Sequence, residues 1–229
     1  MFWWEGQGPG GLRVAFTDTS AGNLALHVGD DPAAVWSNRN ALEEQMGIAS
    51  GSLRFMEQIH SADVAVAGGQ DVPVADALLS PDGSVPLAVM VADCLPVLFA
   101  GTRPGGVVTA AAHAGRRGLL DGILLNTVAA LRSAGARDLM GWVGPGVCGR
   151  CYEVPEAMLA DAQHLPGAES RTRWGTPALD LPAAALHQLK SLGVSAVQVP
   201  GCTMEEPALF SHRRDAPTGR FAGLVWPGL

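Results

Sequence analysis

Glycine and proline break this chain at short intervals, and their spacing limits how long any helix or strand can be. The 229 residues include 29 glycines and 16 prolines, spread along the whole length rather than gathered into a linker. Because both residues favour turns, the distribution predicts many short elements joined by tight connections. The sequence contains no internal repeat and no low-complexity tract. We therefore expect one domain over residues 1–229.

Helix signals occur in four segments. The first helix is expected to begin where Pro32 follows an acidic residue and to end at about Met46, because Gly47 is a typical stop. In the second segment, residues 116–135, apolar side chains recur every three or four positions, as on one face of a helix. The other expected helices cover residues 155–165 and 181–192.

Apolar runs typical of strands are found between the helical segments. Several of these runs follow one another directly, whereas others alternate with helices. A simple doubly wound parallel sheet is therefore not indicated, and the fold class expected is mixed α/β. The strand-like runs are residues 53–59, 63–67, 87–92, 97–100, 107–112, 139–143, 194–199, 208–211 and 221–226.

The composition excludes some classes of protein. Hydrophobic residues make up 48% of the chain and charged residues only 16%, so the chain is not disordered. The net charge of -7 argues against binding to a nucleic acid polymer or to an acidic membrane surface. Of the 15 basic residues, all but Lys190 are arginines, and a few arginines can still form a local site for a small anion.

The location expected for the protein is the cytoplasm. No stretch reaches the roughly 18 apolar residues of a membrane span. The first ten residues, MFWWEGQGPG, lack the basic and long apolar regions of a secretory signal. The four cysteines are too few for a disulfide scaffold of this size, so their thiols are expected to be reduced.

Three segments place a histidine or a cysteine at the edge of an apolar run. They are QIHSADV with His60, VADCLPVLF with Cys94, and AAHAGRRG with His113. Two imidazoles and one thiolate would suit zinc and would leave a fourth position open for water or substrate. Spacings of 34 and 19 residues match no local metal motif, so the residues alone also allow a buried thiol and two hydrogen-bonded histidines.

The same residues also fit a mechanism without metal. Cys94 could act as a nucleophile, with His60 or His113 as its base and Asp93 orienting that base. Such an arrangement predicts acyl-transfer or deamidase chemistry. A metal assay would separate the two hypotheses.

Two further features have an ordinary explanation beside a functional one. Cys148 and Cys151 form a CxxC motif, but it lies in a loop and has no second CxxC, which favours a structural or incidental role. The turn from Gly115 to Gly118 leads into a helix start, where backbone N–H groups favour an anion. Six arginines are candidates for such a site or for an ordinary solvated surface: Arg39, Arg116, Arg117, Arg213, Arg214 and Arg220.

Taken in order, six segments resemble the signature blocks of one family over residues 14–226. The family is the laccase-domain, or multi-copper polyphenol oxidoreductase, family, now regarded as purine nucleoside phosphorylases. The matching segments are NLALHVGDDPAAVWSNR, QIHSADV, VADCLPVLF, AAHAGRRG, GPGVCGRCYEV and FSHRRDAPTGR.

The resemblance implies a single-domain α/β sandwich of mixed sheets flanked by helices, related in fold to deamidating toxins. It also implies one zinc ion, phosphorolysis of adenosine, inosine, guanosine and methylthioadenosine, and deamination of adenosine. The expected partners are a nucleoside and phosphate, and the protein is expected to be a monomer or a weak homo-oligomer. The implied metal ligands are His60, Cys94 and His113; Asp93 joins them as a catalytic residue, Arg39, Arg117, Arg213 and Arg214 are candidates for phosphate, and Asn23 and Gln58 for the sugar or base.

Two points depart from the family pattern: Arg116, and Cys148, which has no assigned role in the block that Cys151 matches. Arg116 stands where the family usually has tryptophan, which changes the expected wall of the pocket. The name multi-copper is also doubtful on physical grounds. A multi-copper site needs many histidines, whereas the chain has six in total and only two at the expected site. A copper-dependent polyphenol oxidase and a cysteine-dependent amidohydrolase, such as an enzyme that edits peptidoglycan precursors, remain alternatives.

Overall fold

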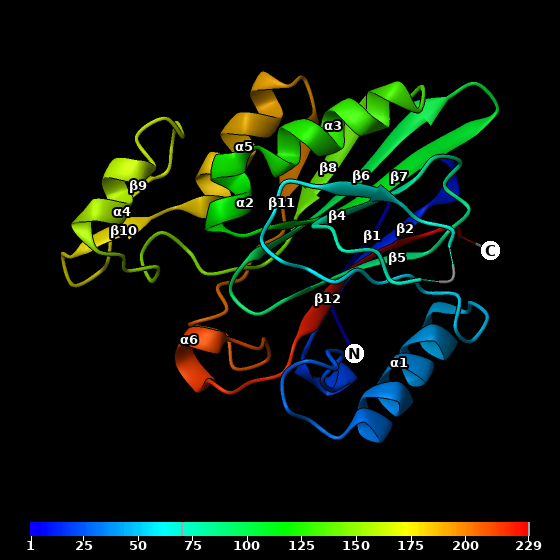
Figure 1. The fold of residues 1–229 in the computed structure, drawn as a ribbon, viewed down its shortest axis with the longest axis horizontal. Coiled ribbons are helices and arrows are strands. Elements are labelled where there is room, and N and C mark those ends of the chain that lie inside the picture. The colour runs from blue at the N-terminus through cyan, green and yellow to red at the C-terminus, as the bar shows by residue number, and fades with distance from the viewer. Residues whose placement is uncertain (70, 229) are drawn as a thin grey trace.

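The computed structural model describes residues 1–69 and 71–228 and confirms a mixed α/β fold (Figure 1). The helices are α1 (Pro32–Met46), α2 (Arg116–Asp121), α3 (Ile123–Ser133), α4 (Glu156–Asp161), α5 (Leu181–Ser191) and α6 (His212–Asp215), with short 3-10 turns at Pro9–Gly11 and Thr19–Ala21. The strands are β1 (Phe2–Gln7), β2 (Arg13–Thr17), β3 (Val64–Val66), β4 (Ala77–Ser80), β5 (Leu87–Val91), β6 (Leu95–Arg103), β7 (Gly106–Ala114), β8 (Arg137–Val143), β9 (Glu169–Arg171), β10 (Pro177–Leu179), β11 (Ser195–Gln198) and β12 (Phe221–Trp226).

A six-stranded mixed sheet forms the centre of the fold, in the order β11-β8-β6-β7-β4-β3. Its two outer pairs are parallel and its inner pairs are antiparallel. Successive side chains of a strand point to opposite faces, and both faces of this sheet are covered. Accordingly, Val97 and Phe99 of β6 pack toward one core, whereas Leu98 and Ala100 pack toward another. This two-sided burial explains why β6 and β7 are almost continuously apolar in sequence.

The four-stranded sheet, in the order β1-β2-β12-β5, packs on one face of the central sheet. Phe16 of β2 and Phe221 of β12 are fully buried between the two sheets. Helix α1 covers the outer face of the four-stranded sheet, where its Leu42 packs on Met90 and Leu224 (Figure 1). Helices α2, α3 and α5 cover the opposite face of the central sheet (Figure 1). The result is a sandwich of one mixed sheet and one antiparallel sheet with helices on both sides, whereas both sheets were expected to be mixed.

The structure corrects several boundaries expected from the sequence. Residues 53–59 are not a strand, because their pairing is limited to isolated bridges at Arg54 and Glu57. The helix expected over residues 116–135 is two helices, because Gly122 has a φ of 92° that ends α2 and starts α3. The helix expected over 155–165 is shorter, and 208–211 form no strand but lead into α6. Strands β1, β2, β4, β9 and β10 were not anticipated.

Within residues 1–69 and 71–228, none of the helices combines the length and apolar character needed to cross a bilayer.

Candidate metal centre and adjoining cavity

Three side chains that are far apart in sequence meet at one edge of the central sheet. Cys94 lies in the turn between β5 and β6, and His113 lies next to the end of β7, so the β6–β7 ladder brings them together. His60 comes from the loop before β3. Their ligand atoms all lie within 4.8 Å of one another, and Cys94 Sγ is 3.9 Å from His60 Nε2. The convergence that spacing alone could not establish is therefore present in the fold.

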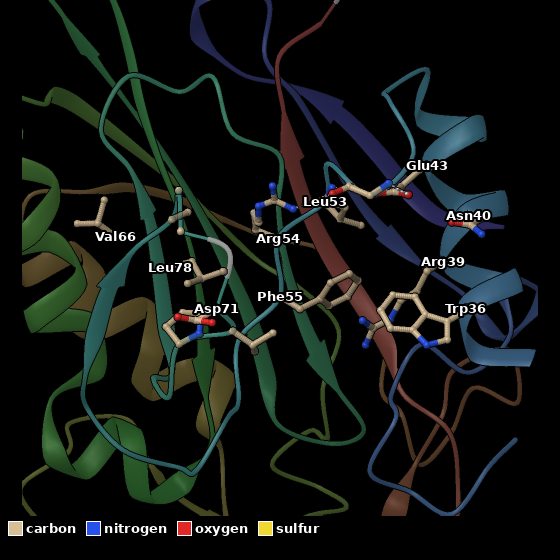
Figure 2. A pocket seen from close by; sticks show the side chains of 16 residues that line it. Trp36, Arg39, Asn40, Glu43, Leu53, Arg54, Phe55, Val66, Asp71 and Leu78 are labelled. Carbon is tan, nitrogen blue, oxygen red and sulfur yellow. Dashed lines mark hydrogen bonds between the residues drawn. The ribbon is translucent and has the colours of Figure 1, made fainter. Parts of the chain in front are cut away.

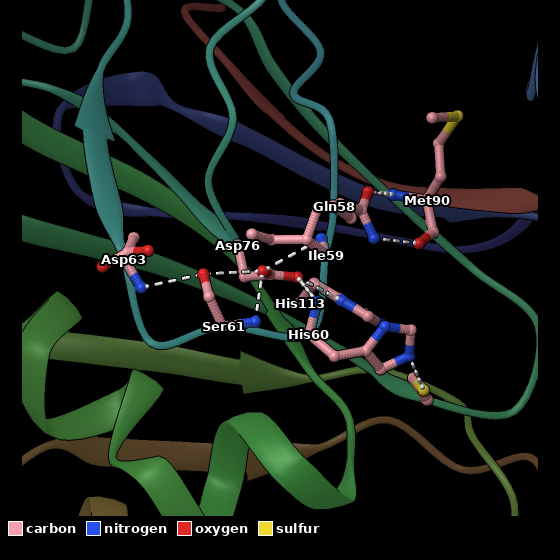
Figure 3. Close-up of polar contacts among 9 residues, drawn as sticks. Gln58, Ile59, His60, Ser61, Asp63, Asp76, Met90 and His113 are labelled. Carbon is pink, nitrogen blue, oxygen red and sulfur yellow. Dashed lines mark hydrogen bonds and ion pairs between the residues drawn. The ribbon is translucent and has the colours of Figure 1, made fainter.

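Asp76, just before β4, organises two of the three residues, and the sequence analysis did not identify it. Its fully buried carboxylate lies 2.7 Å from His113 Nδ1 and accepts backbone N–H bonds from Ile59, His60 and Ser61 (Figure 3). Because His113 Nδ1 is held by Asp76, the other ring nitrogen, Nε2, is the one available to a metal. The signal that was missed is a lone aspartate beside an apolar strand, in the segment ADALLS.

Backbone strain occurs in two of the three segments that supply the candidate ligands. His60 has a φ of 62° and Asp93, beside Cys94, has a φ of 94°, a region that residues other than glycine rarely adopt. Hydrogen bonds hold both in place, since His60 N donates to Asp76 and Asp93 O accepts from Val147 N. Such strain is common where a fold must aim a functional side chain.

Without a metal ion, electrostatics at the site favours a thiolate at Cys94, a carboxylate at Asp76 and a protonated imidazole at His113, whose proton a metal ion would have to displace. Burial raises the pKa of the Cys94 thiol, but hydrogen bonds to His113 and His60 and their positive charge outweigh it and lower the pKa to about 6. Burial raises the pKa of Asp76, but bonds from His113 and Ser61 lower it to about 2. Burial lowers the pKa of His113, but Asp76 and Cys94 raise it to about 9. A thiolate and a fixed carboxylate thus stand on either side of one imidazole.

A cavity of about 350 Å³ opens directly onto the three residues. His60 is exposed toward solvent, Cys94 is half-buried and His113 is buried, so an ion bound between them would have an accessible side. Besides these three, the cavity is lined by His27, Gln58, Met90, Val91, Ala92, Asp93, Tyr152, His212, Arg213 and Arg220.

Asp93 lines this cavity, but its carboxylate is occupied by other groups. One oxygen accepts from the hydroxyls of Thr203 and Ser211, and the other accepts from the backbone N–H of Arg213. The carboxylate that holds a ligand histidine is therefore Asp76 rather than Asp93. Asp93 instead ties the Cys94 turn to the two C-terminal segments of the cavity wall.

Arg213 reaches the cavity, whereas the other arginines expected to bind phosphate do not line it. The Arg213 guanidinium lies over the ring of Tyr152 and donates to Glu153 O. Arg214 donates to the carbonyls of the neighbouring loop and pairs with Asp215. Arg117 is on the surface, 3.5 Å from Asp121.

Arg39 lies in a second cavity of about 500 Å³, on the α1 side of the molecule (Figure 2). Its guanidinium donates to Leu24 O and stacks on Phe55 at 3.8 Å and beside Trp36 at 5.2 Å. Burial lowers its pKa and Glu43 opposes that effect. Arg39 Nη2 also lies 3.9 Å from Met90 Sδ, so Arg39 joins α1 to β5 of the four-stranded sheet and does not line the cavity beside Cys94.

The two polar residues expected to bind the sugar or base have partners of their own. Gln58 lines the cavity, but its side-chain amide bonds both the N–H and the carbonyl of Met90 (Figure 3). Asn23 is buried and bonds Asp30, Ala25 and the N–H of Arg220 outside the cavity lining. Arg220, one of the six arginines considered for an anion site, does line the cavity. Tyr152, His27 and His212 also line it, and nothing in the sequence pointed to these three.

Two features noted in the sequence lie nearby. Arg116, where a tryptophan was expected, points toward α4, and its guanidinium is 3.9 Å from Asp161. Cys148 and Cys151 lie with Cys202 rather than at the start of a helix. Burial, together with Cys148 and Cys202 and against the bond from Arg173, raises the pKa of Cys151 to about 12. Such a thiol is a poor nucleophile, so a thioredoxin-like role does not fit.

Comparison with known proteins shows the family. A family model described as multi-copper polyphenol oxidoreductase laccase matches residues 10–228. The chain belongs to this family. The purine nucleoside phosphorylase SCO2081 of Streptomyces coelicolor is 44% identical, with 94% of this chain and 96% of the relative covered. The purine nucleoside phosphorylase Rv2149c of Mycobacterium tuberculosis is 45% identical, with 95% and 88% covered.

Solved structures agree with this assignment. Protein NMB0706 of Neisseria meningitidis superposes with a TM-score of 0.84 at 36% identity, and 99% of each chain is covered. YlmD of Geobacillus stearothermophilus gives a TM-score of 0.87 at 29% identity, with 100% of this chain and 99% of that chain covered. The family resemblance and the sandwich fold expected from the sequence blocks are thereby confirmed.

Proposed function

We propose that this protein is a zinc-dependent purine nucleoside phosphorylase that acts on inosine, guanosine, adenosine and methylthioadenosine. The observation that carries the proposal is one cavity that contains both the His60, Cys94 and His113 cluster and two arginines, Arg213 and Arg220. The names of the similar proteins from Streptomyces and Mycobacterium support the same activity.

The donor set suits zinc. Two imidazole nitrogens and a thiolate are typical zinc ligands, and three protein ligands leave one position open, as in catalytic sites. A single copper ion with an axial methionine would need a thioether beside Cys94. Met90, the methionine in the cavity lining, directs its Sδ toward Arg39 Nη2 at 3.9 Å and away from His60 (Figure 3). Bound zinc would supply a Lewis acid at the base of the cavity.

The arginines give the cavity a positive end that suits phosphate. Burial lowers the pKa of His27, and the positive charges of Arg220 and Arg39 lower it further. Of these two arginines only Arg220 lines this cavity, together with Arg213, and two guanidinium groups in one cavity favour a bound anion. Phosphate held by Arg213 and Arg220 would lie in the same cavity as the nucleoside.

In phosphorolysis, a phosphate oxygen forms a bond to ribose C1′ while the bond from C1′ to the base nitrogen breaks. The bonding electrons leave with the base, which takes up a proton, and the sugar leaves as ribose 1-phosphate. The arginines would lower the cost of bringing the phosphate dianion to C1′ by holding it in position. Tyr152, stacked with Arg213, would shield this arrangement from water.

Deamination of adenosine is the second reaction proposed for the same cavity. A water oxygen would bond to purine C6, and the amino group would leave as ammonia with a proton taken from the water. Phosphate has no part in this step, so the two reactions differ in their dependence on phosphate. The ratio of ammonia to free base would report which reaction dominates.

The test is a nucleoside panel assayed with and without phosphate, on protein of known metal content. The proposal expects hypoxanthine from inosine only when phosphate is present, and expects no product after zinc removal. Hypoxanthine released at the same rate without phosphate would contradict phosphorolysis. Equal activity of metal-free protein would contradict the role of zinc.

A cysteine-dependent amidohydrolase is a second candidate function. The contacts that link Cys94, His113 and Asp76 favour it. Cys94 has a lowered pKa, His113 lies next to it, and Asp76 holds His113 Nδ1 at 2.7 Å. A thiolate, an imidazole and an orienting carboxylate are the parts of a cysteine hydrolase. This candidate expects full activity on an amide substrate after zinc removal and loss of that activity when Cys94 is alkylated.

A further inference from the structure

A second cluster of metal-ligating side chains lies behind the cavity wall. It contains the thiols of Cys148, Cys151 and Cys202 and the carboxylate of Glu205, and these four ligand atoms all lie within 4.8 Å of one another. All three cysteines are free. The proposed nucleoside phosphorylase activity uses none of these four residues.

The cluster is formed by two matching turns. Cys148 O accepts from the N–H groups of Cys151 and Tyr152, and Cys202 O accepts from those of Glu205 and Glu206, each at 2.9 Å. Both turns therefore present ligands at positions i and i+3, as Cys-x2-Cys and Cys-x2-Glu. Paired Cys-x2-Cys turns are typical of structural zinc sites, and here Glu205 takes the place of the fourth cysteine.

The fold fixes the two turns against each other. The first turn follows β8 and the second follows β11, and these strands are parallel neighbours. Beyond the strands, Gly146 pairs with Cys202, and Thr203 N donates to Gly146 O. Cys148 N donates toward Cys202 Sγ at 3.4 Å, which links the turns directly. The ligands are thus brought together by backbone pairing.

Burial and charge also fit a bound cation. Cys151 and Cys202 are 2% and 6% exposed, among Val147 and Tyr152. Arg173 Nη2 lies 2.9 Å from Cys151 Sγ and 2.6 Å from Glu205 Oε1. A guanidinium cannot bind a metal ion, but it can offset part of the negative charge of three thiolates and a carboxylate around a divalent ion.

We propose that Cys148, Cys151, Cys202 and Glu205 form a second, structural metal site for a thiolate-preferring divalent cation, for which zinc is the best chemical match. Ligand atoms around tetrahedral zinc with bonds of about 2.3 Å lie about 3.8 Å apart, so small side-chain movements would close the cluster. Four protein ligands leave no open position, which separates this site from the catalytic one.

The second site would brace the wall of the first. Thr203, next to Cys202, donates through its hydroxyl to the Asp93 carboxylate at 2.6 Å. Val147, next to Cys148, donates to Asp93 O at 2.9 Å. Tyr152, next to Cys151, lines the cavity itself. A metal ion at the cluster would fix the positions of these three residues relative to one another and to the cavity.

The test is metal analysis of the full-length protein purified under reducing conditions, and it does not depend on catalysis. We expect two zinc ions per chain in the wild type, one in Cys94→Ser and one in Cys148→Ser. Cobalt added to the Cys94→Ser protein should give strong thiolate-to-metal charge-transfer absorption, which Cys148→Ser should remove from the double variant. One zinc ion in the wild type, together with no cobalt–thiolate absorption in Cys94→Ser, would overturn the proposal.

Glu205→Gln is a second variant that should leave the fold intact, because the Glu205 side chain is exposed. Glu205→Gln should lower the affinity for the second metal ion by at least roughly 10- to 100-fold, which is the loss typical when a residue that only supports a ligand is replaced. Glu206→Gln, at the next position, should leave that affinity unchanged. Equal metal affinity in Glu205→Gln and Glu206→Gln would contradict ligation by Glu205. Thiol titration of the wild type provides a second check. Two fewer free thiols than the sequence contains, restored by reductant and without metal bound at the cluster, would show a disulfide in place of the metal site.

Discussion

Asp76 and His113 form a buried pair in which the carboxylate lies 2.7 Å from Nδ1. The same carboxylate also binds the backbone of the segment that contains His60. One residue therefore sets the ring orientation of one proposed ligand and the backbone position of another. This relationship makes the geometry of the candidate metal centre depend on a residue that is not itself one of the three candidate ligands.

Replacement of Asp76 by asparagine should weaken zinc binding roughly 10- to 100-fold, the usual cost of losing a partner of a ligand histidine. Asparagine retains the size of the side chain but removes its charge. Competition with a chromophoric chelator would measure the affinity. Asp63→Asn, an exposed carboxylate in the same loop, is the matched control and should bind zinc as the wild type does. Equal affinities in the two variants would contradict the role of Asp76.

The Asp76 pair should also make stability depend on pH. The pKa of Asp76 is about 2 in the folded protein against 3.8 for a free side chain. Because the folded value is lower, the stabilisation is complete above about pH 4 and disappears as the pH falls toward 2, and it amounts to about 2 kcal/mol. Urea unfolding of wild type and Asp76→Asn between pH 2.5 and 6 should show a difference that shrinks on acidification. A difference that stays constant with pH would be evidence against this account.

Gly115 borders the metal centre closely. A Cβ atom there would lie 2.9 Å from Cys94 Sγ and 3.0 Å from His60 Cδ2. Gly115→Ala should therefore displace both side chains and reduce the zinc content of the purified protein. Gly106→Ala is the control, because a Cβ at that position meets nothing within 4 Å. The idea fails if the two alanine variants retain the same amount of zinc.

Arg220, one of the two arginines that line the cavity, should act on phosphate. Loss of a charge-assisted hydrogen bond costs about 1.5–3 kcal/mol, so Arg220→Gln should raise the KM for phosphate roughly 10- to 150-fold. The KM for inosine should change much less. Arg137→Gln, at the exposed start of β8, should leave both values unchanged. Equal increases in both KM values would instead indicate a general collapse of the cavity.

Local sequence signals predicted part of this fold well. The α1 boundaries followed from the Pro32 start and the Gly47 stop, because capping is decided by a few adjacent residues. The strands β5 to β8 followed from apolar runs that are buried on both faces. Strand pairing could not be predicted in this way, since β12 joins β2 and β5 across most of the chain.

The site was predictable to a similar extent. His60, Cys94 and His113 were found as reactive residues at the edges of apolar runs, although the run before His60 is not a strand. Their contact depends on tertiary structure, such as the ladder between β6 and β7 that brings Cys94 and His113 together. Asp76 gave only the weak signal of an aspartate in an apolar run. The arginines were the least predictable, because Arg39 and Arg117 share their residue type with Arg213 but differ from it in burial and location. Charge in a sequence does not reveal which cavity a side chain lines.

The most direct measurement is the yield of ribose 1-phosphate and hypoxanthine from inosine and phosphate, with wild-type and Cys94→Ala protein of known zinc content. Metal-dependent phosphorolysis predicts equal amounts of the two products from the wild type and almost none from Cys94→Ala, whose zinc at the His60 and His113 site should be lost. Undiminished formation of both products by Cys94→Ala, or hypoxanthine accompanied by free ribose, would contradict the proposed function.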